Sequence, residues 1–240
     1  MAFLPPEQLT LTGSCLCTAI RYTITVPPLP SRPLIPNALP TPVDATATVP
    51  TRLPLVSLDH CESCRRGCGG LIQCWFICPQ DWVEFTLQPR RQQRAATDPS
   101  TAAATGRDAG DGDGAADRVY PSASVASNPP QKLLDETYLA HYESSPGVHR
   151  CFCSRCGTGL TWCNSKDRGP GWTLGPIVDV AVGTLDRESM ERVRPERQGW
   201  WEDGVGWVKR LLSEGDGGLI KHPSGRVSEQ VGVGFSGGSG

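Results

Sequence analysis

The chain has 240 residues, of which 38% are hydrophobic and 20% charged, with a formal net charge of -2. This balance produces no overall field that would attract nucleic acid or an anionic membrane, so neither is expected as a partner. No segment reaches the ~18–20 consecutive apolar residues of a membrane-spanning helix, and the N-terminus lacks the basic and apolar regions of a secretory signal.

Eleven cysteines in a chain without an export signal indicate metal binding in a reducing compartment rather than a disulfide framework. We therefore expect an intracellular protein, with the cytoplasm as its compartment. The 27 Gly and 22 Pro residues are unevenly distributed, which is typical of one compact domain interrupted by inserts. The expected organisation is a leader (1–12), one zinc-binding β domain (13–212), a Pro-rich insert (27–54), a disordered insert (88–130) and a flexible C-terminal tail (213–240).

The first cysteine cluster is Cys15-Leu16-Cys17, and an alternating strand is expected directly after it. Apolar and polar residues alternate from residue 19 to residue 26, the period of a half-buried strand. Nine prolines between residues 27 and 54 exclude a central strand there, because proline lacks the N–H that a ladder needs.

A second cluster, running from Asp59 to Cys64, comes after a short apolar strand at residues 55–58. We expect turns at residues 65–70, a buried strand at 71–78 and an alternating strand at 82–85. Residues 88–130 contain almost no large apolar side chains, so they are expected to be disordered.

Order is expected to return at Leu133, and residues 148–152 form a strand that delivers Cys153 and Cys156. Further strands are expected at residues 160–162 and 177–182, a capped helical turn at Asp186, and an amphipathic piece at 200–212. About seven short strands with many turns predict a mostly β domain with little helix.

The spacing of the cysteines predicts two zinc sites. Cys15 and Cys17 combine with Cys153 and Cys156 into a closed four-thiolate site, the usual arrangement of structural zinc. The middle cluster supplies Cys61 and Cys64, with Asp59 or His60 as a third ligand and a fourth position open to water or substrate. The alternative is that Cys68 completes a second structural site.

With these motifs the chain resembles the glutathione-dependent formaldehyde-activating enzyme family, also called the centromere protein V domain family. The matching residues occur in one order along residues 13–212 and skip both inserts. They are Gly13-Ser-Cys15-Leu-Cys17, His60-Cys61-Glu-Ser-Cys64-Arg65, Tyr142-Glu-Ser-Ser-Pro-Gly147, Phe152-Cys153-Ser-Arg-Cys156-Gly157 and Gly183-Thr-Leu-Asp186.

The resemblance implies a β-tent fold similar to the Mss4-like fold, with zinc knuckles, a structural zinc on the four outer cysteines and a catalytic zinc on the middle motif. It also implies a carbon–sulfur lyase that forms S-hydroxymethylglutathione from glutathione and formaldehyde. Here Asp59 stands where the family has the first cysteine, and His60 matches a histidine that is not a ligand. A carboxylate is a competent zinc ligand of the same charge, so Asp59, Cys61 and Cys64 are the expected catalytic residues.

Two functions are therefore considered from the sequence. The first is a zinc-dependent carbon–sulfur lyase-like enzyme whose partners are a small-molecule thiol and an aldehyde, with glutathione as the co-substrate. Arg65, Arg66 and Arg150 are candidates for binding a glutathione carboxylate, because guanidinium groups pair bidentately with carboxylates. The second is a non-catalytic zinc module that serves as a protein-interaction scaffold.

Overall fold

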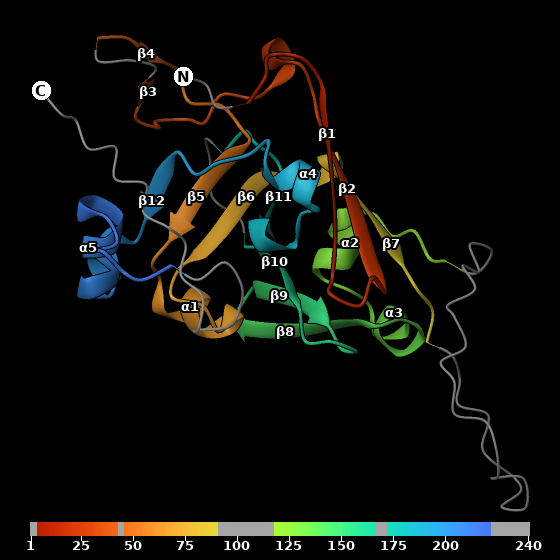
Figure 1. The fold of residues 1–240 in the computed structure, drawn as a ribbon. Coiled ribbons are helices and arrows are strands. Elements are labelled where there is room, and N and C mark those ends of the chain that lie inside the picture. The colour runs from red at the N-terminus through yellow and green to blue at the C-terminus, as the bar shows by residue number, and fades with distance from the viewer. Residues whose placement is uncertain (1–3, 43–45, 91–117, 167–171, 222–240) are drawn as a thin grey trace, which may run out of the picture.

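The computed structural model describes residues 4–42, 46–90, 118–166 and 172–221, and it is mostly β with antiparallel sheets (Figure 1). The strands are β1 (Leu9–Ser14), β2 (Ile20–Val26), β3 (Thr41–Pro42), β4 (Thr48–Val49), β5 (Leu55–Asp59), β6 (Gln73–Pro79), β7 (Val83–Leu87), β8 (Leu139–Ser145), β9 (Val148–Cys153), β10 (Gly159–Asn164), β11 (Ile177–Ala181) and β12 (Arg197–Gly199). The helices are α1 (Glu62–Cys68), α2 (Ala123–Ser127), α3 (Gln131–Glu136), α4 (Arg187–Met190) and α5 (Gly206–Glu214), with short 3-10 turns between some elements.

Two sheets carry the domain. The smaller has the order β1-β2-β7, and the larger has the order β12-β5-β6-β11-β10-β9-β8. Neighbouring strands are antiparallel except for β12, which runs parallel to β5. Figure 1 shows the smaller sheet on the right of the view and β12, β5 and β6 on the left, with β8 and β9 below. Helix α2 packs against β7, β9 and β10 and so contacts both sheets.

The core lies between the two sheets, and the pattern of the strands explains why. In β2 the apolar residues Ile20, Tyr22, Ile24 and Val26 are buried while Arg21 and Thr25 are exposed. All five residues of the central strand β11 are buried. Each large apolar side chain buried in this way contributes about 1.5–3 kcal/mol relative to exposure. The expected mostly β class is thus confirmed, and the strands predicted around both cysteine clusters are present.

The expected leader is wrong in its last four residues. Leu9 and Leu11 are 1% and 0% exposed, and β1 pairs with β2 in the register Leu9↔Val26. The reason is that the sequence Leu-Thr-Leu-Thr alternates with the period of a strand, and a short turn lets it fold back on β2.

The Pro-rich insert is packed onto the domain rather than separate from it. Its prolines keep it out of the two main sheets, as expected, but Arg32 is only 4% exposed. The Arg32 guanidinium donates hydrogen bonds to the carbonyl oxygens of Pro5, Glu7 and Pro27 at 2.6, 3.0 and 2.8 Å. A buried guanidinium is tolerated here because main-chain acceptors satisfy it.

The second insert is shorter than the sequence predicts. Residues 91–117 lie outside the described residues, but residues 118–130 belong to the domain. Val119 pairs with Leu87 across an isolated bridge, and Ala123 and Ala126 of α2 are 1% and 2% exposed in the core. Small side chains hide this helix in the sequence, because two buried alanines give a weak apolar pattern.

Four further expectations need correction. Residues 65–70 are not all turns, because residues up to Cys68 lie in α1, which ends at Gly69 with a left-handed φ of 69°. Strand β8 is absent from the sequence prediction, and the helices, although short, are more numerous than "little helix" implies. Helix α5 continues to Glu214, beyond the expected start of the tail at residue 213.

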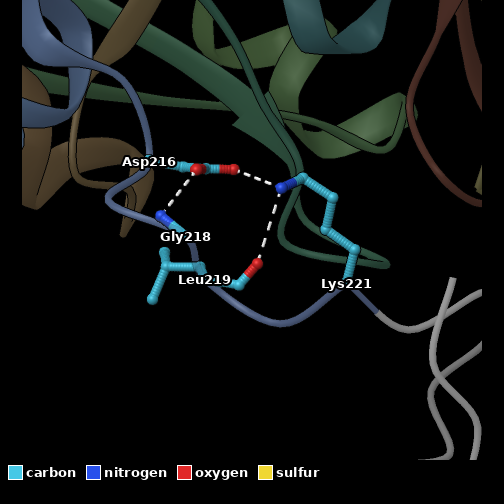
Figure 2. A network of polar contacts seen from close by, with 4 residues as sticks. All are labelled: Asp216, Gly218, Leu219 and Lys221. Carbon is cyan, nitrogen blue, oxygen red and sulfur yellow. Dashed lines mark hydrogen bonds and ion pairs between the residues drawn. The ribbon is translucent and has the colours of Figure 1, made fainter. Parts of the chain in front are cut away.

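The chain after α5 is exposed and forms a small polar turn (Figure 2). Asp216 accepts a hydrogen bond from the Gly218 N–H at 3.0 Å and pairs with Lys221 Nζ at 2.5 Å. These contacts lower the pKa of Asp216, the hydrogen bond from Lys221 most of all. Residues 222–240 of the expected tail lie outside the described residues. Among the helices that the structure describes, none has the length and apolar character required to cross a membrane.

Candidate metal centres

The first candidate centre joins two hairpin turns. Cys15 and Cys17 lie in the connection between β1 and β2, whereas Cys153 ends β9 and Cys156 lies in the turn before β10. The ligand atoms of all four cysteines lie within 4.8 Å of one another. Both turns are tight, since Thr18 and Gly157 adopt positive φ values of 58° and 76°. The expected four-cysteine grouping is therefore present.

The spacing of these sulfurs suits a tetrahedral metal. Cys17 Sγ lies 3.6 Å from Cys15 Sγ and 3.7 Å from Cys153 Sγ. Zinc–sulfur bonds of about 2.3 Å in a tetrahedron place the sulfurs ~3.8 Å apart. The Ile20 N–H also points at Cys15 Sγ at 3.3 Å, as suits an anionic sulfur. The residues present thus fit a closed zinc site.

The surroundings act differently on the thiols of Cys15, Cys153 and Cys156. Burial raises the pKa of Cys15 and of Cys153. Burial acts in the same direction on Cys156, but hydrogen bonds from Thr158 and from the backbone of Cys17 outweigh it and lower the pKa of Cys156 to about 6. Hydrogen bonds to a sulfur favour its thiolate form, which is the form that binds metal. Hydrogen bonding thus favours the thiolate at Cys156, whereas burial opposes it at Cys15 and Cys153.

The second candidate centre lies where β5 ends and α1 begins. Asp59, Cys61 and Cys64 have ligand atoms within 4.8 Å of one another. The Asp59 carboxylate oxygen Oδ1 accepts a hydrogen bond from the Cys61 N–H at 2.8 Å. Cys61 caps α1 and Cys64 is three residues on, so both thiols project from the same end of the helix. Asp59 and Cys61 are half-buried and Cys64 is buried.

Three protein ligands leave one position of a tetrahedral metal open. The thiols of Cys61 and Cys64 also differ in acidity. Burial raises the pKa of Cys64 to about 12, against a hydrogen bond from Arg150 that lowers it. For Cys61 burial also acts upward, but hydrogen bonds from the Ser63 side chain and from backbone N–H groups outweigh it, and the pKa is lowered. The Cys61 Sγ to Ser63 Oγ distance is 3.1 Å.

The two alternative ligands considered from the sequence lie outside this cluster. His60 is 2% exposed, and its Nε2 is 3.0 Å from Gln198 Oε1 while its ring packs edge-on against Trp201. Cys68 is exposed at the far end of α1, with its Sγ near the Arg65 carbonyl oxygen. Asp59 is consequently the residue that the fold places with Cys61 and Cys64.

The three candidate arginines differ in position. Arg150 reaches from β9 to the cluster, with Nη2 at 3.5 Å from both Cys64 Sγ and Ser63 Oγ. Arg66 forms an exposed ion pair with Glu62 at 2.8 Å on the same helix. Arg65 is half-buried on α1 and its side chain has no hydrogen bond or ion pair within the described part of the chain. Of the three, Arg150 contacts the cluster.

A cavity of about 630 Å³ adjoins the second cluster. Ser63 and Arg150 line it, and Trp75, another lining residue, packs against Cys64. The other lining residues come from α1 and from β6, β8, β9, β10 and β11 or the turns beside them: Arg66, Gly67, Cys68, Gln73, His141, Tyr142, Ser144, Cys151, Phe152, Gly157, Gly159, Leu160, Thr161 and Ala181. Sequence reasoning misses this wall because its residues come from separate strands, and no local motif marks them.

Comparison of the sequence with models of known protein families and with curated proteins finds no match.

Proposed function

We propose that the second cluster binds zinc and that the protein catalyses reversible carbon–sulfur bond formation between a thiol and an aldehyde. The observation that carries this proposal is the contrast between the two clusters. The first has four cysteine ligands and is closed. The second has three ligands and adjoins a cavity large enough for a small molecule.

The motif resemblance supports the same chemistry. It implies a β-tent arrangement, and the mostly β fold with a four-cysteine cluster between two sheets supports this part of the proposal. It also implies glutathione as the thiol and formaldehyde as the aldehyde, with S-hydroxymethylglutathione as the adduct. In the addition, the sulfur forms a bond to the aldehyde carbon, the carbonyl π electrons move to oxygen, and the proton of the thiol ends on that oxygen.

A zinc ion held by Asp59, Cys61 and Cys64 would supply Lewis acidity that favours the thiolate form of a nearby thiol. The residues of the chain provide the rest. Arg150 donates toward Cys64 Sγ and offsets the negative charge gathered there. The buried side chains of Trp75 and Leu160 keep one wall of the cavity apolar, which holds reactants together and limits water.

Asp59 gives this centre its own character. Its carboxylate is fixed by the Cys61 N–H, so the oxygen ligand is held without a further side chain. A carboxylate is a harder ligand than a thiolate. Zinc should therefore bind less tightly than in a three-thiolate centre while acting as a stronger Lewis acid.

The test compares metal content and turnover in wild type, Asp59→Ala and Asp59→Cys, with Cys68→Ser as a control on the same helix. Wild type should hold about two zinc ions per chain, and Asp59→Ala about one, without unfolding. Turnover of thiol and aldehyde should fall sharply in Asp59→Ala and persist in Asp59→Cys. A wild type that holds about one zinc per chain, lost only on unfolding, would refute the proposal and favour the scaffold.

A further inference from the structure

The cavity beside the second cluster has an unusual balance of charge. Its lining includes no aspartate or glutamate, and its cationic residues are Arg66 and Arg150. Arg66 forms an ion pair with Glu62, and its side chain is 74% exposed. Within the described residues, the positive charge that faces the cavity without an acidic partner is therefore that of Arg150.

The hydrogen bonds of Arg150 leave one face of its guanidinium open. Nε donates to Ser144 Oγ at 3.3 Å, and Nη2 donates toward Ser63 Oγ and Cys64 Sγ. Of the five N–H groups of an arginine, the two on Nη1 have no partner among the described residues. Nη1 lies beside Gly67 of α1, where a Cβ would approach it to 3.3 Å, so this position places no side chain over Nη1.

The larger part of the remaining lining is apolar and partly aromatic, although the polar residues Gln73, His141, Ser144 and Thr161 also line the cavity. Trp75 is 5% exposed and Leu160 is 1% exposed, while Phe152 of β9 lines the same space. Tyr142, on the neighbouring strand β8, is 62% exposed and contributes to the rim. Flat ring faces and a buried leucine suit a planar apolar body rather than a peptide with several charges.

We propose that this cavity binds a small molecule with an aromatic or apolar body and a single carboxylate, which pairs with Arg150 Nη1. This inference rests on the proposed function, in that the ligand is the thiol or aldehyde of that reaction. Glutathione fits the lining poorly, because it carries an ammonium group for which no lining residue offers a carboxylate. A buried ammonium without a partner is costly. Where the ligand is the thiol of the reaction, it is then a carboxylate-bearing aryl or alkyl thiol.

The test measures binding to the zinc-loaded full-length protein by calorimetry, with probes that contain no thiol. Phenylacetate should bind more tightly than benzylamine and than S-methylglutathione. Arg150→Met should weaken phenylacetate binding roughly 10- to 100-fold, the effect of losing a charge-assisted hydrogen bond. Arg66→Met is the matched control and should change it less than about twofold.

A further variant tests whether Arg150 or the metal binds the carboxylate. Asp59→Ala should retain phenylacetate binding, because the cavity wall and Arg150 are unchanged. Loss of binding in Asp59→Ala, combined with normal binding in Arg150→Met, would show that the metal holds the carboxylate and would overturn the inference. Tighter binding of S-methylglutathione than of phenylacetate would overturn it as well.

The outcomes also separate this inference from the proposed function. Turnover is measured with formaldehyde and either glutathione or (4-mercaptophenyl)acetate. Phenylacetate binding that depends on Arg150, without turnover of either thiol, supports the ligand class and refutes the reaction. Turnover of glutathione alone, with no Arg150-dependent phenylacetate binding, supports the reaction and refutes the ligand class.

Discussion

Substitution of Gly67 by alanine should stabilise the protein and weaken ligand binding at the same time. Gly67 lies in α1 and its φ is not positive, so alanine can adopt the same backbone conformation. Glycine in a helix is less favourable than alanine by about 0.5–1 kcal/mol. The free energy of unfolding should rise by about that amount.

The added methyl group meets Arg150 and little else. A Cβ at position 67 would lie 3.3 Å from Arg150 Nη1, 3.6 Å from Cζ and 3.7 Å from Cδ. This is closer than an ordinary contact, but the guanidinium is the far end of a flexible side chain. A shift of a few tenths of an ångström relieves the contact at little cost, yet it moves Nη1 away from the carboxylate it is proposed to bind.

Thermal unfolding and calorimetry on the same preparations check both effects. A gain of 1 kcal/mol raises Tm by about 2–4 °C in a chain of this size, and the affinity for phenylacetate should fall several-fold. Gly206→Ala is the control, because Gly206 lies in α5, where the nearest atom to its Cβ is 3.9 Å away and belongs to Arg210. An unchanged phenylacetate affinity in Gly67→Ala would refute the assigned role of Arg150. A lower Tm would refute the expectation that the guanidinium moves at little cost.

Three other outcomes are expected. Cys156→Ser should give an aggregating or unfolded protein with less zinc, because zinc binding at a structural site is coupled to folding. Cys68→Ser, at an exposed position, should behave as wild type. Equal melting temperatures of the two variants would contradict a structural role of Cys156. Replacing residues 91–117, which contain no large apolar residue, with a short Gly/Ser linker should leave Tm nearly unchanged. Replacing residues 91–128 should unfold the domain, because it removes the buried side chains of α2. Similar Tm values for both variants would show that α2 contributes little to stability. Burial and the neighbouring His149 lower the pKa of His141, against a smaller opposite effect of Glu143. The protein should therefore lose stability as pH falls below the pKa of ~6.5 that histidine has in the unfolded chain. His141→Gln should flatten the decline of Tm between about pH 7 and 5, and an identical pH profile would contradict this.

The sequence predicts the parts of this fold that depend on local spacing. The alternation from Ile20 to Val26 is the burial pattern of β2. The grouping of Cys15 and Cys17 with Cys153 and Cys156 can be predicted for a related reason. The short spacing within each cysteine pair indicates two metal ligands, even though the two pairs are distant in the sequence.

The features that the sequence does not predict depend on contacts between distant segments. Strand β8 carries Tyr142, Glu143 and Ser145 in exposed positions, since it is the edge of the larger sheet, and therefore has no clear apolar face. Helix α2 is buried through small alanines. The cavity is equally hidden in the sequence, because its wall is assembled from α1 and from strands that are adjacent only after the larger sheet has formed.

The two clusters differ in what their supporting elements allow. At the first, Cys15, Cys17 and Cys156 lie in hairpin turns and Cys153 ends β9, so a metal there would connect the smaller sheet to β9 and β10. At the second, one ligand ends β5 and two lie at the start of α1, so all three are on neighbouring positions of one segment. A single segment can hold three ligands on one side of a metal, and the opposite side then faces other elements. Here Arg150 of β9 contacts the sulfur of Cys64, and Trp75 of β6 packs against the same residue. Both Arg150 and Trp75 line the cavity. Arg150 thus contacts the candidate metal cluster through Nη2 and also lines the cavity, so the effect of its substitution on ligand binding has to be compared with the metal content of the same preparation.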